Sequence, residues 1–194
     1  IASEGSIGPD VVVPFINSDI ECMAWVDTAR DIEIVEFHRS LDVVSARTFV
    51  SSKDSLDEFL KSADFPHHSL IARAENGRGE IYKGINSFER LESALKALFR
   101  DSPSVVIEND LRSHHSPSRQ RNIAAVAEKL MSRLLQLCVK CETPGWGEIG
   151  YLYGLECREC RNIEERAVRG RVMGCARCEY QEEVLNEKKF AEPA

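Results

Sequence analysis

The stretch Ser104–Cys138 reads SVVIENDLRSHHSPSRQRNIAAVAEKLMSRLLQLC and joins the segments that decide the fold. It opens with a short apolar run, SVVIE, which is typical of a buried strand. Its second half predicts an amphipathic helix, with Ser116 as the N-cap and Pro117 in the first turn. Apolar residues continue at helical spacing to Leu137, and a series of cysteine pairs begins at Cys138. We therefore expect a strand, a polar loop and a long helix that ends at Cys138.

Strands and helices are also expected to alternate upstream of this stretch. Runs rich in β-branched and aromatic residues predict strands over 22–27, 32–38, 45–50 and 68–74. Capping and periodicity predict helices over about 55–63 and 87–100, and glycines and prolines predict mostly loop over 1–20. The pattern indicates an α/β body over residues 1–137, a mixed sheet with flanking helices. Because the chain starts without Met or a signal-peptide pattern, we expect this body to be the C-terminal part of a larger α/β domain.

Six of the seven cysteines fall in three CxxC pairs, which predict a small zinc-ribbon-like module over 138–181 and a charged, frayed or weakly helical tail over 182–194. Each CxxC can turn two thiolates toward one cation, and two such pairs complete a tetrahedral site for a structural Zn²⁺. A redox dithiol and reduced, unliganded cysteines are the alternative interpretations. Cys22 lies in an apolar strand and fits a small buried hydrophobe. The predicted metal ligands are Cys138, Cys141, Cys157, Cys160, Cys175 and Cys178.

Six thiolates exceed one tetrahedral ion and fall short of two separate ones. Either one pair is spare, or it recruits outside ligands such as His114 and His115, or two ions share thiolates. The sequence leaves these alternatives open. A reducing, cytoplasmic location fits metal-bound thiolates better than a secreted disulfide framework does.

The polar loop before the long helix is a candidate site. Helix N-termini bind anions, and Arg112 and Arg119 could clamp a phosphate or carboxylate. His114 could act as acid, base or metal ligand, and Asp110 could orient a histidine, so these two are the candidate catalytic residues. A solvated cap, with arginines paired to neighbouring carboxylates, explains the same residues equally well. Two other segments could add anion contacts, although a plain turn and a charged hairpin tip explain them too: Ser3, Glu4 and Ser6, and Arg73 and Arg78.

The composition limits the partners. A net charge of −7 argues against a general nucleic-acid binder, which usually carries a basic face. Residues 158–177 form a local exception, with six arginines against three glutamates. No apolar run is long enough to span a bilayer, so we expect no membrane partner. Two hypotheses follow. The first is an enzyme, or former enzyme, with a site for a small phosphorylated or carboxylated molecule, and the second is a zinc-ribbon binding protein that docks on nucleic acid or another protein.

Four segments in this order resemble an uncharacterised bacterial family of unknown function. They are IASEGSIGP, ENGRGEIYKGI, NDLRSHHSPSRQRNIAAVAEKL and the three CxxC pairs. The family's motifs look like ASEGSFGPHP and TDMRAHxNPTRM. The chain departs from them at Asp10-Val11, which replaces His-Pro, and at Asn109, Leu111, Ser113, Ser116 and Ser118. The resemblance implies the outline of the fold and the zinc tail, and it names no reaction.

Overall fold

The computed structural model describes residues 1–52 and 54–192. The chain is a mixed α/β protein, built mostly of strands, and it forms two compact units. Unit 1 comprises Ile1–Ser3, Met23–Glu36 and Ala127–Ala194, and unit 2 comprises Glu4–Cys22 and Phe37–Val126. The sequence predicted a boundary after residue 137 between two independently folding parts, and this boundary remains a prediction.

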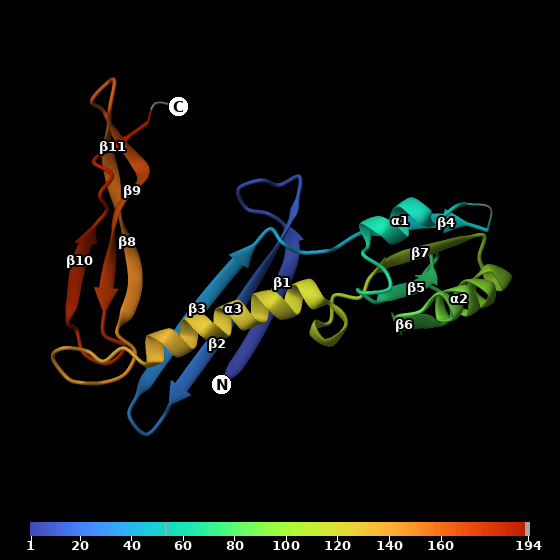
Figure 1. Cartoon of the computed structure of the whole chain (residues 1–194), viewed down its shortest axis with the longest axis horizontal. Coiled ribbons are helices and arrows are strands. Elements are labelled where there is room, and N and C mark those ends of the chain that lie inside the picture. The colour runs from blue at the N-terminus through green and yellow to red at the C-terminus, as the bar shows by residue number, and fades with distance from the viewer. Residues whose placement is uncertain (53, 193–194) are drawn as a thin grey trace. The chain divides into compact units, whose positions relative to one another are not determined.

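Unit 2 contains a four-stranded antiparallel sheet with the order β4-β7-β5-β6. Its hydrophobic core lies between one face of this sheet and two helices, whose apolar residues pack on Leu70, Val105 and Ile107 (Figure 1). Ser87 caps the second helix by accepting a hydrogen bond from the backbone N–H of Arg90. The elements are β4 (Arg47–Ser51), α1 (Asp57–Ser62), β5 (Leu70–Ala74), β6 (Ile81–Ile85), α2 (Phe88–Asp101) and β7 (Ser104–Asn109).

A second sheet has the order β1-β2-β3, with β1 (Ala2–Pro9), β2 (Asn17–Asp27) and β3 (Ile32–Ser40). Strands β2 and β3 and helix α3 (Pro117–Leu134) each contribute residues to both units. In unit 1, Ile32 and Ile34 of β3 form a small core with Leu130 of α3. Among the described residues, no helix is long and apolar enough to cross a membrane.

A third sheet, entirely within unit 1, has the order β10-β9-β8-β11. Strands β8 (Gly147–Cys157) and β9 (Ile163–Gly174) form a long antiparallel hairpin. On its sides lie β10 (Gln181–Leu185), which is antiparallel to β9, and β11 (Phe190–Ala191), which is parallel to β8. The expectation of a frayed or helical tail is therefore wrong. Gly170 explains part of the pairing, because a side chain there would come within 2.6 Å of the Val184 carbonyl oxygen.

Three other expectations about elements need correction. Residues 2–9 form strand β1, although residues 1–20 were expected to be mostly loop. Strand β2 begins at Asn17, before the expected start at Cys22, because its polar residues are buried and hydrogen-bonded. Helix α3 ends at Leu134, four residues before the expected end at Cys138. The backbone N–H of Cys138 donates to the Thr143 carbonyl in a turn, so it cannot continue the helix.

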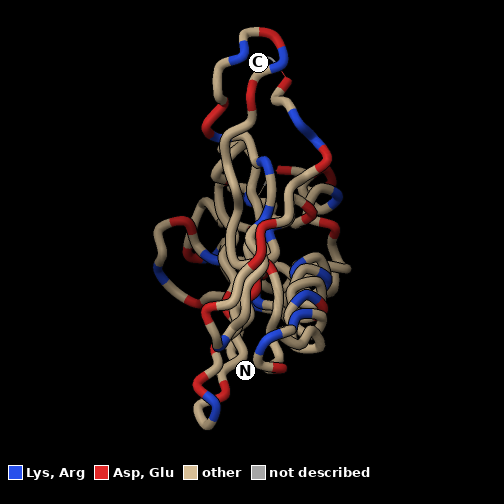
Figure 2. The backbone as a smooth tube through the Cα atoms, turned by 90° about the vertical axis from the view of Figure 1, so that its left-hand side faces the viewer, with Lys and Arg blue, Asp and Glu red and all other residues tan. Residues whose placement is uncertain are grey.

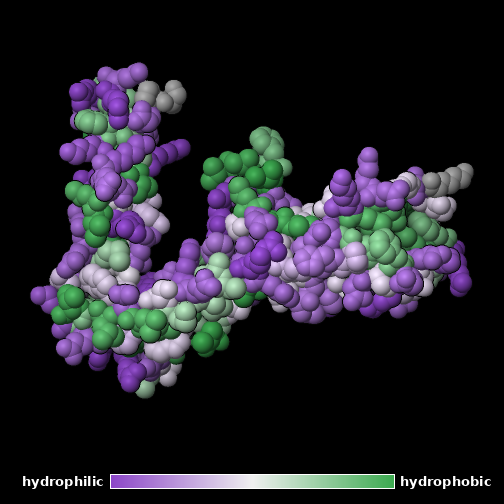
Figure 3. Space-filling view, viewed as in Figure 1, coloured by the Kyte–Doolittle hydropathy of each residue, from purple (hydrophilic) through white to green (hydrophobic). Residues whose placement is uncertain are grey.

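The loop between β1 and β2 presents an apolar surface in unit 2. Val11, Val12 and Phe15 are strongly exposed, with Phe15 at 92%, and Figure 3 shows hydrophobic residues gathered on this loop. Asp10 holds the loop, since its carboxylate accepts hydrogen bonds from the Val12 and Val13 backbone N–H groups at 2.9 and 2.8 Å. Arg39 pairs with the same carboxylate. Asp10 therefore has a structural role in this loop.

Candidate functional site

Four cysteines of unit 1 bring their thiols together in one cluster. The sulfur atoms of Cys138, Cys141, Cys175 and Cys178 all lie within 4.8 Å of one another. Cys138 Sγ lies 3.7 Å from Cys178 Sγ, and Cys141 Sγ lies 3.6 Å from Cys175 Sγ. Tetrahedral coordination with Zn–S bonds of about 2.3 Å places sulfur atoms about 3.8 Å apart. The cluster therefore has the dimensions of a four-thiolate metal site.

Backbone donors already point at these sulfurs. The N–H groups of Arg177 and Cys178 each lie 3.3 Å from Cys175 Sγ, and that of Lys140 lies 3.4 Å from Cys138 Sγ. Such N–H···S hydrogen bonds stabilise thiolates, which are the metal-binding form of cysteine. The cluster can therefore hold a metal ion.

The pKa values of Cys141 and Cys178 are shifted in opposite directions. Hydrogen bonds with Thr143 lower the pKa of Cys141 to about 6. At Cys178 the backbone N–H of Tyr180 favours the thiolate, but burial and the three neighbouring thiols together raise the pKa to about 12. Four thiolates packed this closely repel one another, and a divalent cation at their centre is what would allow all four to ionise.

The middle pair, Cys157 and Cys160, lies at the turn of the β8–β9 hairpin. The strand register explains this separation: Gly147 pairs with Gly174 at the open end of the hairpin and Glu156 with Ile163 at its closed end. The first and third cysteine pairs therefore meet at the open end, and the second pair lies at the tip. The six expected ligands are thus divided into four that cluster and two that lie apart from the cluster.

In unit 2, a network of buried polar side chains surrounds the N-terminus of α3. Asp110 is fully buried, and Arg112 binds it with two hydrogen bonds, of 2.8 and 2.5 Å. The backbone N–H of Gly84 donates to the same carboxylate at 3.0 Å. Burial alone would raise the pKa of Asp110, but the donors outweigh it and lower the pKa below its usual value. Asp110 is therefore held as a carboxylate, a state that suits a positioning role better than proton donation.

A second part of this network joins β2 to α3. Arg119 donates to Glu21 at 2.6 Å and to the Leu111 carbonyl at 2.8 Å. Asn122, one turn later, donates to buried Asp19 at 2.9 Å. Burial raises the pKa of Glu21 against the opposing effect of Arg119, and the Asp19 carboxylate raises it further. Among the described residues, Asp19 Oδ1 is a buried oxygen without a hydrogen-bond partner.

Two glycines allow the close packing of this network. A side chain at Gly5 would clash with Arg119 and Glu21, both within 2.3 Å of its Cβ position. Gly84 has a φ of +64°, and a side chain there would reach the His115 ring at 2.8 Å. The segments around Gly5, Gly84 and Arg119, which lie far apart in the sequence, therefore converge in unit 2.

Asp64, His68 and Ser118 form a chain of contacts with the order of a Ser-His-Asp triad. His68 Nδ1 lies 2.8 Å from Asp64, and its Nε2 lies 3.0 Å from Ser118 Oγ. His68 and Ser118 are buried, and the backbone N–H of Ser118 also donates to His68 Nε2, at 3.1 Å. A nucleophile must reach its substrate, which this serine cannot do. The arrangement therefore fixes the start of α3 to the loop before β5.

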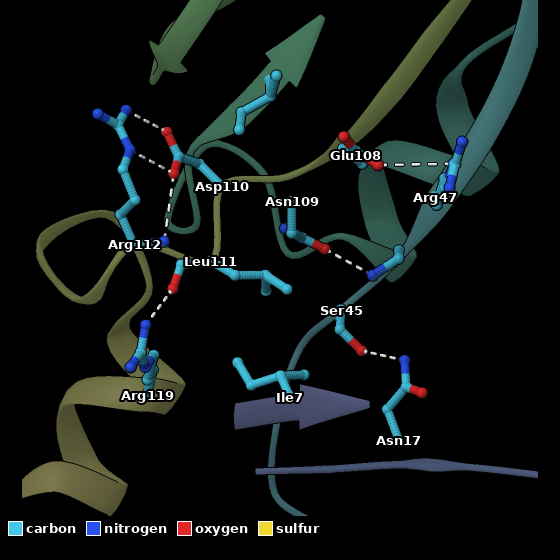
Figure 4. Close-up of a pocket in the computed structure, with 12 residues that line it drawn as sticks. Ile7, Asn17, Ser45, Arg47, Glu108, Asn109, Asp110, Leu111, Arg112 and Arg119 are labelled. Atoms are coloured by element: carbon cyan, nitrogen blue, oxygen red, sulfur yellow. Dashed lines mark hydrogen bonds and ion pairs between the residues drawn. The ribbon is translucent and has the colours of Figure 1, made fainter. Parts of the chain in front are cut away.

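A pocket of about 490 Å³ lies in unit 2 beside this network. Ile7, Leu111, Asn109, Ser45 and Asn17 surround its centre in Figure 4. The same figure shows arginines at the edge, each turned toward a partner: Arg112 to Asp110, Arg47 to Glu108 and Arg119 to the Leu111 carbonyl. Its volume is that of a small-molecule site.

The structure gathers some of the predicted site residues and separates others. Asp110, Arg112 and Arg119 line the pocket. His114 is exposed beside His115, and the imidazole nearest Asp110 is that of His115, at 4.0 Å. Arg73 approaches Glu108 at 3.7 Å. Arg78 lies exposed in the β5–β6 turn, at the opposite end of β5 from Asp110.

Ser3, Glu4 and Ser6 lie exposed on β1. Gly5 contacts Arg119 and Glu21, and Ile7 lines the pocket. Strand alternation therefore turns Ser6 away from the pocket. The residues of this motif that reach the site are Gly5 and Ile7, which were not candidates.

Several buried polar residues escaped the sequence analysis, chiefly Asp19, Glu21 and Asn122. The signal available was the spacing of Asp19 and Glu21, two residues apart, which places both on one face of a strand. Arg119 and Asn122, three residues apart on a helix, offered matching donors.

The family described as Domain of unknown function (DUF6671) has a model that matches residues 1–194, and the chain belongs to this family. This confirms the resemblance to an uncharacterised family. No curated protein and no solved structure matches the chain.

Proposed function

We propose that unit 1 carries a structural Zn²⁺ bound by Cys138, Cys141, Cys175 and Cys178, as the core of a zinc-ribbon-like module. The observation that carries this proposal is the separation of the four sulfurs, which matches tetrahedral zinc thiolate. Four protein ligands leave no open position for a substrate, so the ion has a structural role. Zn²⁺ would let the four thiolates coexist and would join the end of α3 to strands β8, β9 and β10.

Elemental analysis tests this proposal. Protein prepared under reducing conditions without chelators should contain at least about one equivalent of zinc per chain. The double variant Cys141→Ser/Cys175→Ser should lose it, while Cys22→Ser, outside the cluster, should retain it. Iron in place of zinc would retain the thiolate site and change the ion. No bound metal in freshly made protein would overturn the proposal.

We further propose that unit 2 binds a small phosphorylated or carboxylated molecule in the pocket beside Asp110. Support comes from the arginines at its edge. Arg112 and Arg119 each form a short hydrogen bond to a buried carboxylate. Arg47, in contrast, is half exposed and forms only a long ion pair with Glu108, at 3.5 Å. An anion could therefore recruit Arg47 at little cost, since an exposed ion pair contributes about 1 kcal/mol at most.

Titration with inorganic phosphate, citrate and a sugar phosphate tests the pocket, with melting temperature and calorimetric heat as readouts. Arg47→Ala should weaken binding about tenfold, the loss of one charge-assisted hydrogen bond. Arg78→Ala is the matched control, because Arg78 is also an exposed arginine but lies at the other end of β5. Equal affinities in wild type, Arg47→Ala and Arg78→Ala would contradict the proposed pocket.

The alternative is that the zinc module docks on nucleic acid or a protein partner. Residues 158–177, with six arginines against three glutamates, favour this alternative. Figure 2 shows acidic segments among the basic ones on this hairpin, so its charge is mixed. A salt-dependent mobility shift with RNA or DNA would support docking on nucleic acid.

A further inference from the structure

The three CxxC segments share one backbone hydrogen bond. In each, the N–H of the first cysteine donates to the carbonyl five residues later: Cys138 to Thr143 at 2.9 Å, Cys157 to Asn162 at 2.8 Å and Cys175 to Tyr180 at 3.1 Å. The first and third segments supply the four clustered thiols. The middle segment, Cys157–Asn162, therefore has the backbone of a metal knuckle.

The match between the first and middle segments extends further. Glu142 N–H donates to the Cys138 carbonyl at 2.9 Å, and Arg161 N–H donates to the Cys157 carbonyl at 3.2 Å. Glu142 and Arg161, each directly after a second cysteine, have φ angles of +54° and +62°. This left-handed conformation costs a non-glycine residue about 1 kcal/mol or more, and it recurs at the same position.

Contacts with strand β11 hold the turn that carries the middle pair. Strand β11 steadies the turn, because Ala191 pairs with Cys157 and the Arg158 N–H donates to the Ala191 carbonyl at 3.1 Å. Arg161 lies over the Phe190 ring. These contacts fix the turn that carries the two thiols, and Cys160 is exposed on it.

Two thiolates provide half of a tetrahedral site. Within the described residues, Cys157 and Cys160 belong to no group of three or more potential metal ligands. The other two ligands of a metal site at this pair would therefore come from another molecule. The same pair on a second copy would supply two more thiolates, just as the first and third pairs complete one another within unit 1.

The surroundings of the pair suit contact between two copies. A two-fold axis brings each residue of a patch opposite another residue of the same patch, so a patch with both charges can complement itself. Arg158 and Arg161 lie beside Glu156, Glu159 and Glu192 at this tip. Four of these five charges form two loose pairs within the chain, Arg161 with Glu156 at 3.1 Å and Arg158 with Glu192 at 3.3 Å. These exposed ion pairs can exchange partners between copies at little cost.

We propose that Cys157 and Cys160 form half of a second zinc site, which the same two cysteines of a second copy of this chain complete across a two-fold axis. Zinc binding there displaces the remaining thiol protons to solvent and involves no change in oxidation state. The contact links two chains through their hairpin tips and leaves both the four-thiol cluster and the pocket of unit 2 unused.

Light scattering and zinc analysis of the full chain under reducing conditions test the proposal. Wild type should form a dimer with about 1.5 zinc ions per chain, and chelation should return it to monomer. Cys157→Ser/Cys160→Ser should be monomeric with about one zinc per chain, which also shows that the four-thiol cluster still folds. Cys22→Ser is the matched control and should remain dimeric with the wild-type zinc content.

Cadmium-113 NMR gives a readout that requires no substitution. Cadmium-loaded wild type should show two four-sulfur resonances with areas of about two to one, the smaller from the shared site. A wild-type monomer with one ion per chain, or a dimer that persists in Cys157→Ser/Cys160→Ser, would overturn the proposal. A spectrum that contains the smaller resonance but not the larger one would contradict the structural zinc site. It would still support the shared site.

Discussion

At Asp110, a fully buried carboxylate depends on a half-exposed arginine. The Arg112 side chain is 45% exposed, yet its guanidinium makes both side-chain hydrogen bonds to Asp110. Its exposure suggests a free ligand for an anion, whereas its contacts indicate that it neutralises a buried charge. The two roles predict different losses of folding stability when the side chain is removed.

We expect Arg112→Ala to lower the free energy of unfolding by about 3 kcal/mol, because it leaves the Asp110 carboxylate buried and poorly paired. The lowered pKa of Asp110 stabilises the fold above pH about 4, and this contribution is lost as the pH falls through the folded-state pKa. The variant should lose much of that acid dependence. Urea denaturation at pH 7, at pH 4 and at pH about 2.5 measures both effects, because the contribution of Asp110 is lost only below about pH 4.

Arg47→Ala is the control for this prediction, since Arg47 is about as exposed and its partner Glu108 is also partly exposed. It should cost less than about 1 kcal/mol. Similar losses in the two variants would mean that Asp110 does not depend on Arg112.

His68 should make the fold sensitive to mild acid. Burial lowers the pKa of His68, despite the opposing effect of Asp64, so the folded protein holds this imidazole neutral. The unfolded chain takes up the proton below pH about 6.5, and stability should fall as the pH drops through that value toward the folded-state pKa. Melting temperatures between pH 7.5 and 5.5 check this.

The slope with pH should shrink in His68→Asn but not vanish, because burial lowers the pKa of His115 as well. An unchanged slope in His68→Asn would contradict the assignment.

Among the elements, the β8–β11 sheet has the weakest core of its own. Within the described part of this sheet, Leu155 and Ala191 are the buried apolar residues. Two such side chains stabilise far less than the ordering of four strands costs. A metal ion in the four-thiol cluster at the open end of the hairpin would supply much of the remainder.

We expect zinc removal to loosen this sheet selectively. Hydrogen exchange should accelerate in β8, β9 and β10 after chelation, or in Cys141→Ser, while β5 and β7 stay protected by their own core. Cys22→Ser should exchange like wild type. Uniform acceleration throughout the chain would contradict a local role for the metal.

Local signals predicted the elements well where the deciding interactions are local. Ser87 caps α2 and accounts for its start, and the apolar run of β7 is buried as expected. The start of β2 was missed because Asp19 and Glu21 look unsuited to a buried strand until Asn122 and Arg119 are opposite them. Strand β10 was missed because all its residues are exposed and its pairing with β9 depends on distant glycines.

The same distinction applies to the sites. The spacing of the cysteines predicted a thiolate cluster, but the choice of the first and third pairs follows from the β8–β9 register. In unit 2 the polar loop was recognised as a candidate, whereas its pairing with Glu21 and Gly84 depends on tertiary contacts. Sequence reasoning therefore identified residues whose side chains can bind metals or anions. It missed the side chains and backbone groups with which they pair in the fold.

At the scale of the whole molecule, the two units have separate hydrophobic cores and separate proposed ligand sites. Their hydrophobic clusters share no residues: one is built on Leu70 and Ile107, and the other on Ile32, Ile34 and Leu130. The proposed metal lies in unit 1 and the proposed pocket in unit 2. Helix α3 nevertheless contributes residues to both units, so the loss of one could fray the helix in the other.

We expect two calorimetric transitions that respond to different ligands. Chelation should lower the transition of unit 1 by more than about 10 °C, because the metal contributes much of its folding energy. The transition of unit 2 should move little, and any stabilisation by phosphate should survive chelation, since the pocket uses none of the metal ligands. Cys141→Ser without chelator controls for effects of the chelator itself. A single transition that shifts as a whole, with loss of the phosphate effect, would mean that α3 couples the units into one cooperative fold.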